Sequence, residues 1–177
     1  DLREALDAVA AELIDAFSLG HVGIALLNEE RTALTVVADC SSVADDLGAV
    51  GVVLPLEGNP SSQQVIATRR PLVILDAQNS PLTASIHDVM RWRGTQTLVI
   101  LPLVAGDEVI GTFGLDILEA DRTFTSDEMR LAETIVAQVS TVVQNARLFE
   151  QVQATLAETD ALYRASRDIV VARPPDD

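Results

Sequence analysis

The chain has 177 residues, a formal net charge of −15 and a pI near 4.3. Apolar residues make up 48 % and charged residues 22 %, which is the composition of one globular domain. The acidic balance excludes a nucleic-acid binder and docking on anionic lipid, because both need a basic surface, and no apolar run is long enough to cross a bilayer.

The cysteine content and the N-terminal residues predict the compartment. Cys40 is the single cysteine, so an internal disulfide and a thiolate metal cluster are excluded. The first residues do not form a signal-peptide pattern. We therefore expect a cytoplasmic protein with no membrane insertion.

The first sixty residues predict one helix and two strands. Apolar residues recur at helical spacing up to Phe17, which predicts a helix capped at its C-terminus by Gly20. Two β-rich runs, 22–28 and 33–40, are separated by 29–32, which is hairpin spacing. The run 52–56 is too short to assign from its pattern alone.

The middle of the chain alternates short helices and strands. Asn59 followed by Pro60 is typical of a helix start, and this helix must end before Pro71. A strand is predicted at 72–75, followed by a short amphipathic helix or two turns at 80–92 that end at Gly94. Two β-rich runs, 97–105 and 108–116, flank Gly-Asp and predict a second hairpin.

A long helix closes the sequence. Thr125 and Glu128 form a capping box, and no Gly or Pro follows until Pro174, so some 46 residues could form one helix. At 1.5 Å per residue it would be about 70 Å long. Polar residues (Gln138, Asn145, Thr159 and Ser166) occupy the second row of its heptad pattern. The apolar residues of the first row are seven apart: Ile135, Val142, Phe149, Leu156, Tyr163 and Val170.

This heptad pattern supports two interpretations. The helix is either a core helix with a frayed end, or a parallel dimeric coil that leaves the domain. We favour the dimeric coil, because polar residues in such a seam fix its register.

Four segments in this order resemble a GAF domain of bacterial signalling proteins: 93–103, 107–116, 122–128 and 138–149. The resemblance implies an α+β fold, related to PAS domains, with a central antiparallel sheet of five or six strands. The N-terminal and C-terminal helices would pack on one face of this sheet. Short helices and loops, at about 58–96, would form the roof of a small-molecule pocket on the other face.

The resemblance also implies the organisation of the protein. We expect a sensory domain at 1–150, an exit helix that acts as a coiled-coil linker at 151–172, and a tail at 173–177. The partners expected are a second copy, through the N-terminal and C-terminal helices, a small-molecule ligand, and a covalently linked output or further sensory domain. The alternative is a ligand-free GAF domain that serves only for dimerisation and spacing.

Residues in or near the predicted roof are candidates for ligand binding. Segment 61–105 is the only third of the chain with a positive net charge, +2. The charge of the chain therefore does not exclude an anionic or polar ligand at the predicted roof. An arginine there could hold a carboxylate or phosphate, and the single tryptophan could form a wall of the pocket. The candidate pocket residues are His87, Met90, Arg91, Trp92, Asp76 and Thr97.

Three cofactors known from GAF domains are not expected here. The run Phe124, Asp127, Glu128 departs in spacing from the cyclic-nucleotide motif, whose lysine is also missing, since the chain has no lysine. Ile86 stands where bilin-attaching relatives have a cysteine before the histidine. His87 alone is a weak basis for a haem ligand.

The sequence does not predict an enzyme or a metal site. The pattern shows no Ser-His-Asp set and no metal-ligand spacing, and Cys40 has no second cysteine to resolve a redox reaction. His21 is assigned no role. Asp76 and Asp116, which end strands, are expected to cap turns.

Overall fold

The computed structural model describes residues 2–46 and 48–171, and the side chains up to residue 164. By its internal contacts the chain divides into two compact units, Asp1–Thr141 and Val142–Asp177. The elements, in chain order, are α1 (Leu2–Phe17), β1 (His21–Leu27), β2 (Ala33–Ser41), β3 (Val53–Pro55), α2 (Pro60–Thr68), β4 (Leu72–Ile74), the 3-10 helix η1 (Pro81–Ile86), α3 (His87–Arg93), β5 (Thr97–Ala105), β6 (Glu108–Ile117) and α4 (Ser126–Val171).

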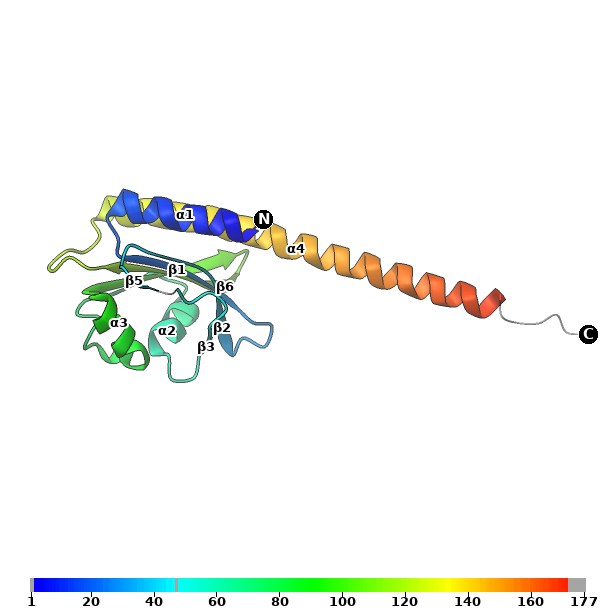
Figure 1. Cartoon of the computed structure of the whole chain (residues 1–177), viewed down its shortest axis with the longest axis horizontal. Helices are drawn as coiled ribbons and strands as arrows, with labels where there is room; N and C mark the ends of the chain where they lie inside the picture. The colour runs from blue at the N-terminus through cyan, green and yellow to red at the C-terminus, as the bar shows by residue number, and fades with distance from the viewer. Residues whose placement is uncertain (1, 47, 172–177) are drawn as a thin grey trace, which may run out of the picture. The chain divides into compact units, whose positions relative to one another are not determined.

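Six strands form one antiparallel sheet in the order β3-β2-β1-β6-β5-β4 (Figure 1). The two hairpins predicted from sequence, β1–β2 and β5–β6, are confirmed. In the first, the Asn28 side chain accepts hydrogen bonds from the backbone N–H groups of Thr32 and Ala33, which holds the turn. The two hairpins meet along β1 and β6, which pair at the centre of the sheet.

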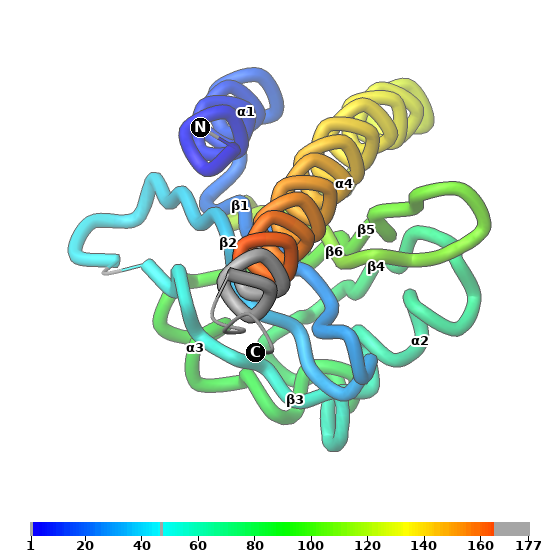
Figure 2. The backbone as a smooth tube through the Cα atoms, turned by 90° about the vertical axis from the view of Figure 1, so that its right-hand side faces the viewer, coloured from blue at the N-terminus to red at the C-terminus, as the bar shows by residue number. Residues whose placement is uncertain are grey.

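One face of the sheet carries α1 and the first part of α4 (Figures 1 and 2). The buried residues of α1 (Leu6, Ala10, Leu13 and Phe17) recur at helical spacing, so they form a single apolar stripe. The ring of Phe17 lies 5.2 Å from that of Phe124, just before α4. The first turns of α4 bury Ala132, Val136 and Val139.

The opposite face of the sheet carries α2, η1 and α3 (Figure 1). The apolar residues there form two separate clusters. One includes Val65, Met90 and Ile100, and the other includes Ala25 and Val36. Because the two clusters do not merge, space is left between them over the middle of the sheet.

The helix caps predicted from sequence are confirmed, with one exception. Asn59 accepts from the backbone N–H of Ser62, and Gly94 ends α3 with φ 76°. The exception is α1, which ends at Phe17, with Ser18 in the left-handed conformation. Gly20 was expected to end this helix. Instead its N–H donates to the carbonyl of Asp116, and the Leu118 side chain fills the place of its missing Cβ.

Strand β2 carries a β-bulge at Val37. Ile24 pairs with Ala38, whereas Ala25 pairs with Val36, so Val37 is an extra residue between two pairs. Side chains of a regular strand alternate between the two faces, and one extra residue reverses that alternation. The bulge therefore places Asp39 on the same face as Val36, which is the face covered by α2 and α3.

Helix α4 is continuous from Ser126 to Val171, as the absence of Gly and Pro predicted. In the second unit, every residue from Leu148 to Arg164 is exposed. Within the described part of the chain, no helix combines the length and apolar character that a membrane span requires. The predicted tail at 173–177, and residue 172 of the predicted exit helix, lie outside the described residues.

Candidate functional site

A cavity of about 510 Å³ lies between the middle of the sheet and the segments that cover it. This volume is within the usual range for small-molecule sites. Its floor is formed by β1 and β6, where Gly23 pairs with Gly114 and Ala25 pairs with Thr112. A Cβ atom added at Gly114 would meet nothing closer than 3.7 Å, so the missing side chain of Gly114 leaves the middle of the floor open.

Most of the cavity wall is apolar. The sheet contributes Leu98 and Ile100 of β5 and Leu54 of β3, and the covering helices contribute Ile86 and Met90. These residues belong to or pack against the two apolar clusters on either side of the cavity. The cavity therefore separates two small cores and does not lie at the edge of one.

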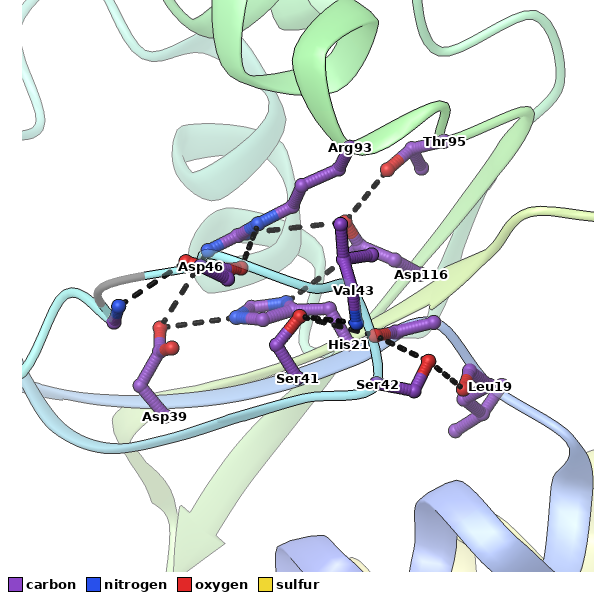
Figure 3. Close-up of polar contacts among 12 residues, drawn as sticks. Leu19, His21, Asp39, Ser41, Ser42, Val43, Asp46, Arg93, Thr95 and Asp116 are labelled. Atoms are coloured by element: carbon purple, nitrogen blue, oxygen red, sulfur yellow. Dashed lines mark hydrogen bonds and ion pairs between the residues drawn. The ribbon is translucent and has the colours of Figure 1, made fainter.

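The other end of the cavity holds a cluster of charged side chains, which we call the polar cluster: His21, Asp39, Asp46, Arg93 and Asp116. Three neighbouring strands supply His21, Asp39 and Asp116. Asp46 comes from the loop after β2, and Arg93 from the last residue of α3. Figure 3 shows His21 between the two strand aspartates, with Arg93 reaching down to them from α3.

His21 is the centre of the polar cluster. Its Nε2 lies 2.9 Å from Oδ2 of Asp39, and its Nδ1 lies 3.4 Å from Oδ1 of Asp116. Burial by itself lowers the pKa of His21, but the hydrogen bonds to Asp116 and Asp39 outweigh it and raise the pKa to about 9. At neutral pH the imidazole is therefore protonated, and both nitrogens donate.

Arg93 joins the three carboxylates from above. Its Nε donates to Oδ2 of Asp46 at 2.8 Å, and its terminal nitrogens lie 3.9 Å from Asp39 and 4.0 Å from Asp116. Thr95 donates to the second oxygen of Asp116 at 2.8 Å. Burial opposes the ionisation of Asp46, but the Arg93 hydrogen bond and the Gly48 N–H keep its pKa below the ordinary value.

One polar atom of the cluster lacks a partner. The Asp39 side chain is 3 % exposed, and its Oδ1 accepts no hydrogen bond from any residue that the structure describes. A buried acceptor without a donor costs free energy, which native proteins usually avoid. Because this oxygen is fully buried, a donor carried by a ligand can reach it only if the Asp39 side chain turns toward the cavity.

The comparisons with known proteins agree with this architecture. The model of the GAF domain family matches residues 1–144. The chain belongs to the GAF domain family. No curated protein matches the sequence.

Solved structures with this GAF fold come from several bacterial signalling proteins. A methyl-accepting chemotaxis protein, residues 122 to 287, is 25 % identical with a TM-score of 0.71, covering 84 % of this chain and 92 % of that one. The GAF domain/HD domain protein from Geobacter sulfurreducens is 17 % identical with a TM-score of 0.73. This match covers 84 % of the present chain and 95 % of the Geobacter chain. The GAF domain of a phosphoenolpyruvate-protein phosphotransferase from Coxiella burnetii is 17 % identical with a TM-score of 0.71. This match covers 85 % of the present chain and 87 % of the Coxiella chain.

Two of the six candidate residues predicted from sequence line the cavity of this GAF domain. Met90 is buried in the wall, and Trp92 is 54 % exposed, so it lies at the cavity opening. The Met90 and Trp92 side chains therefore stay candidates for contact with a ligand.

The other four candidates do not line this cavity. His87 donates from Nε2 to the carbonyl of Ser80, and Asp76 accepts from the Asn79 side chain in the turn after β4. Arg91 is exposed. Thr97 lies one residue before Leu98 on β5, so alternation points it to the opposite face, where it donates to the carbonyl of Arg122.

The polar cluster was missed at the sequence level. His21 had no assigned role, and Asp116 was expected to cap a turn, whereas it lines the cavity. Of the four arginines in segment 61–105, Arg93 lines the cavity, while Arg69, Arg70 and Arg91 are exposed. The positive balance of that segment therefore does not describe the charge of the cavity.

The polar cluster includes a set of groups with metal-ligand chemistry. Ligand atoms of His21, Asp39 and Asp46 all lie within 4.8 Å of one another. However, His21 carries a proton at neutral pH, and Arg93 occupies an oxygen of Asp46. A metal ion bound by these three groups would have to displace both.

Proposed function

We propose that this chain is a ligand-sensing regulatory GAF domain, which passes its ligand state through α4 to an output or further sensory domain. The observation that carries the proposal is the cavity of about 510 Å³ between the sheet and the helices that cover it. A GAF domain that serves only as a spacer has no need to keep two cores apart around an open space.

The segments that cover the cavity are the part of the domain whose conformation a bound ligand would change. Ile86, Met90 and Arg93 belong to η1 and α3 and line the cavity, so a ligand would contact the sheet and these helices at once. A ligand shifts a conformational equilibrium only by its difference in affinity for the two states. We infer that the sensed difference is a change in the position of η1 and α3 over the sheet.

A thermal-shift screen of metabolites, cyclic nucleotides and haem tests the sensing function. A ligand at 100 times its Kd should stabilise the domain by about 2.7 kcal/mol. The control is Gly114→Val, because a side chain there would enter the cavity from its floor, where the nearest atom to an added Cβ is 3.7 Å away. The shift should disappear in this variant. No stabilisation by any compound would favour the spacer function.

The second part of the proposal is a homodimer formed through the N-terminal and C-terminal helices. In α4 the exposed fractions of Val142, Phe149, Leu156 and Tyr163, seven residues apart, are 48 %, 65 %, 59 % and 68 %. Apolar side chains repeated at this spacing form the seam of a coiled coil when a second helix covers them. This supports a parallel pair of α4 helices as the route by which the ligand state leaves the domain.

Sedimentation of the full chain tests the dimer. The double variant Phe149→Glu with Leu156→Glu places charges in the seam, and we expect it to be monomeric. Gln151→Glu with Ala161→Glu adds the same charges on the outer face of the helix, and should stay dimeric. Equal molecular masses for the two variants would contradict the coil.

A further inference from the structure

The chemistry of the cavity lining restricts the class of ligand, if the proposed sensing function holds. Four carboxylates line the cavity among the described residues: Asp39, Asp45, Asp46 and Asp116. Against them stand the guanidinium of Arg93 and the protonated imidazole of His21. The charged groups that face the cavity therefore leave an excess of negative charge.

Neither cationic side chain is free to receive an anion. Arg93 is 9 % exposed, and its nitrogens are directed to Asp46, Asp39 and Asp116. Both nitrogens of His21 face carboxylates. An anionic ligand would have to break these pairs in a buried setting, which would leave the carboxylates without partners.

The polar-cluster atom that lacks a hydrogen-bond partner is an oxygen of a carboxylate. The carboxylate of Asp39 is 97 % buried, lines the cavity and keeps Oδ1 without a donor among the described residues. Asp45, which is exposed, adds a second carboxylate to the lining. A ligand that brings a positive charge and N–H donors would reduce the excess negative charge, and it would satisfy the buried oxygen once the Asp39 side chain turns toward it.

The rest of the cavity accommodates an apolar body. Ala25, Val36, Leu98 and Ile100 line it from the sheet, and Trp92 stands exposed at the opening. Burial of an apolar group against these side chains favours binding in proportion to the area removed from water. The indole face of Trp92 also attracts cations that enter or leave the cavity.

We propose that the ligand is an organic cation, a protonated amine with an apolar body, whose ammonium group is held by Asp39 and Asp45. The apolar body lies over the glycine floor of β1 and β6, under α3. This assignment rests on the proposed function, since it names the ligand class of the same cavity.

Three compounds with one apolar body test the charge preference. They are 4-phenylbutylamine, 4-phenylbutan-1-ol and 5-phenylpentanoate, which place an ammonium, a hydroxyl or a carboxylate on the same phenylbutyl chain. Titration calorimetry of the full chain at neutral pH, with Trp92 fluorescence as a second readout, gives their affinities. We expect the amine to bind at least about tenfold tighter than the alcohol, and the carboxylate to bind weakest.

Two substitutions locate the ammonium group. Asp45→Asn and Asp39→Asn each remove one carboxylate charge, and we expect each to reduce the advantage of the amine over the alcohol several-fold. Asp39 also pairs with His21, so Asp45→Asn, at an exposed position, is the variant that keeps the fold unaffected. The matched control is Asp88→Asn, since Asp88 is exposed on α3 and does not line the cavity. This control should keep the full advantage.

The outcomes separate this inference from the sensing function. Equal affinities of the three compounds, tightest binding of 5-phenylpentanoate, or an advantage that both aspartate variants retain would overturn the cation assignment. So would binding of Zn²⁺ that competes with the amine and is lost in Asp46→Asn, because it would indicate a metal centre. If the amine fails to bind at millimolar concentration while another compound in the thermal-shift screen binds, only the ligand class is wrong. If no compound binds, the sensing function fails as well.

Discussion

Nε2 of His21 on β1 lies 2.9 Å from Oδ2 of Asp39 on β2, with 6 % of His21 exposed. The opposite nitrogen of the ring faces Asp116 on β6. The imidazole thus connects three strands by charged hydrogen bonds beneath the cavity. Its protonation state consequently affects both the stability of the sheet and the charge of the site.

The pH dependence of folding should report on this group. Since the pKa of His21 rises from 6.5 to about 9 on folding, its contribution is complete below pH 6.5 and is lost as the pH rises to 9. The upper limit of this contribution is about 3 kcal/mol. We expect urea denaturation to show a fall in the free energy of unfolding from pH 6 to pH 9, and His21→Gln to flatten it. A parallel fall in the variant would show that other groups cause it.

Arg93 should be much more important for stability than its neighbour on α3, Arg91. The Arg93 side chain is 9 % exposed among three carboxylates, whereas that of Arg91 is 51 % exposed. Removal of one partner from a buried charged cluster leaves uncompensated charge, at a cost of about 3 kcal/mol. Arg93→Met should therefore destabilise strongly, and Arg91→Met should stay within about 0.5 kcal/mol of the parent. Similar midpoints in urea for both variants would contradict the buried cluster.

Two glycines of β6 should differ in their response to the same added methyl group. A Cβ at Gly111 would collide with the carbonyl oxygen of Ala25, which is backbone and cannot move aside. At Gly114 the nearest atom is 3.7 Å away. We expect Gly111→Ala to cost about 2 kcal/mol or more in thermal denaturation and Gly114→Ala to be close to neutral. Equal melting temperatures would show that β1 and β6 are not paired in this register.

One substitution should measure the contribution of the α4 capping box to stability. The backbone N–H of Glu128 donates to Oγ1 of Thr125, and Glu128 accepts in return from the backbone N–H of Thr125. Thr125→Ala should cost about 1 kcal/mol of stability. Thr134→Ala is the matched control, since Thr134 is exposed within the same helix and alanine has the higher helix propensity. A loss of stability in the control as large as that at Thr125 would show that the cap is not the cause.

The fold could be predicted from sequence because its signals are local. Asn59 before Pro60, Gly106-Asp107 between two β-rich runs, and the pair Thr125 and Glu128 each determine a turn or cap through bonds to near neighbours in sequence. The order of these elements, together with the four segments that resemble those of GAF domains, indicated the GAF fold.

The polar cluster could not be predicted in the same way. His21 and Asp116 are 95 residues apart, and their contact depends on the pairing of β1 with β6. Asp39 was still harder to place, because a regular β2 strand would direct its side chain to the face covered by α1. The signal for the β-bulge is not present in the alternation of residue types. Trp92 and Met90 were found because they belong to a short helix whose position the family implies.

The extra residue at Val37 determines which functional group of β2 the cavity contains. With the bulge, the carboxylate of Asp39 faces the cavity, and the thiol of Cys40 lies on the side of α1, where burial and Asp7 raise its pKa. A β2 strand that kept Val37 but paired without the bulge would exchange the two positions. A thiol would then enter the chamber, and the carboxylate would move to the opposite side of the sheet. The ligand preference of this scaffold thus depends on a one-residue shift in the pairing of β2, with no change in the residues that provide the chemistry.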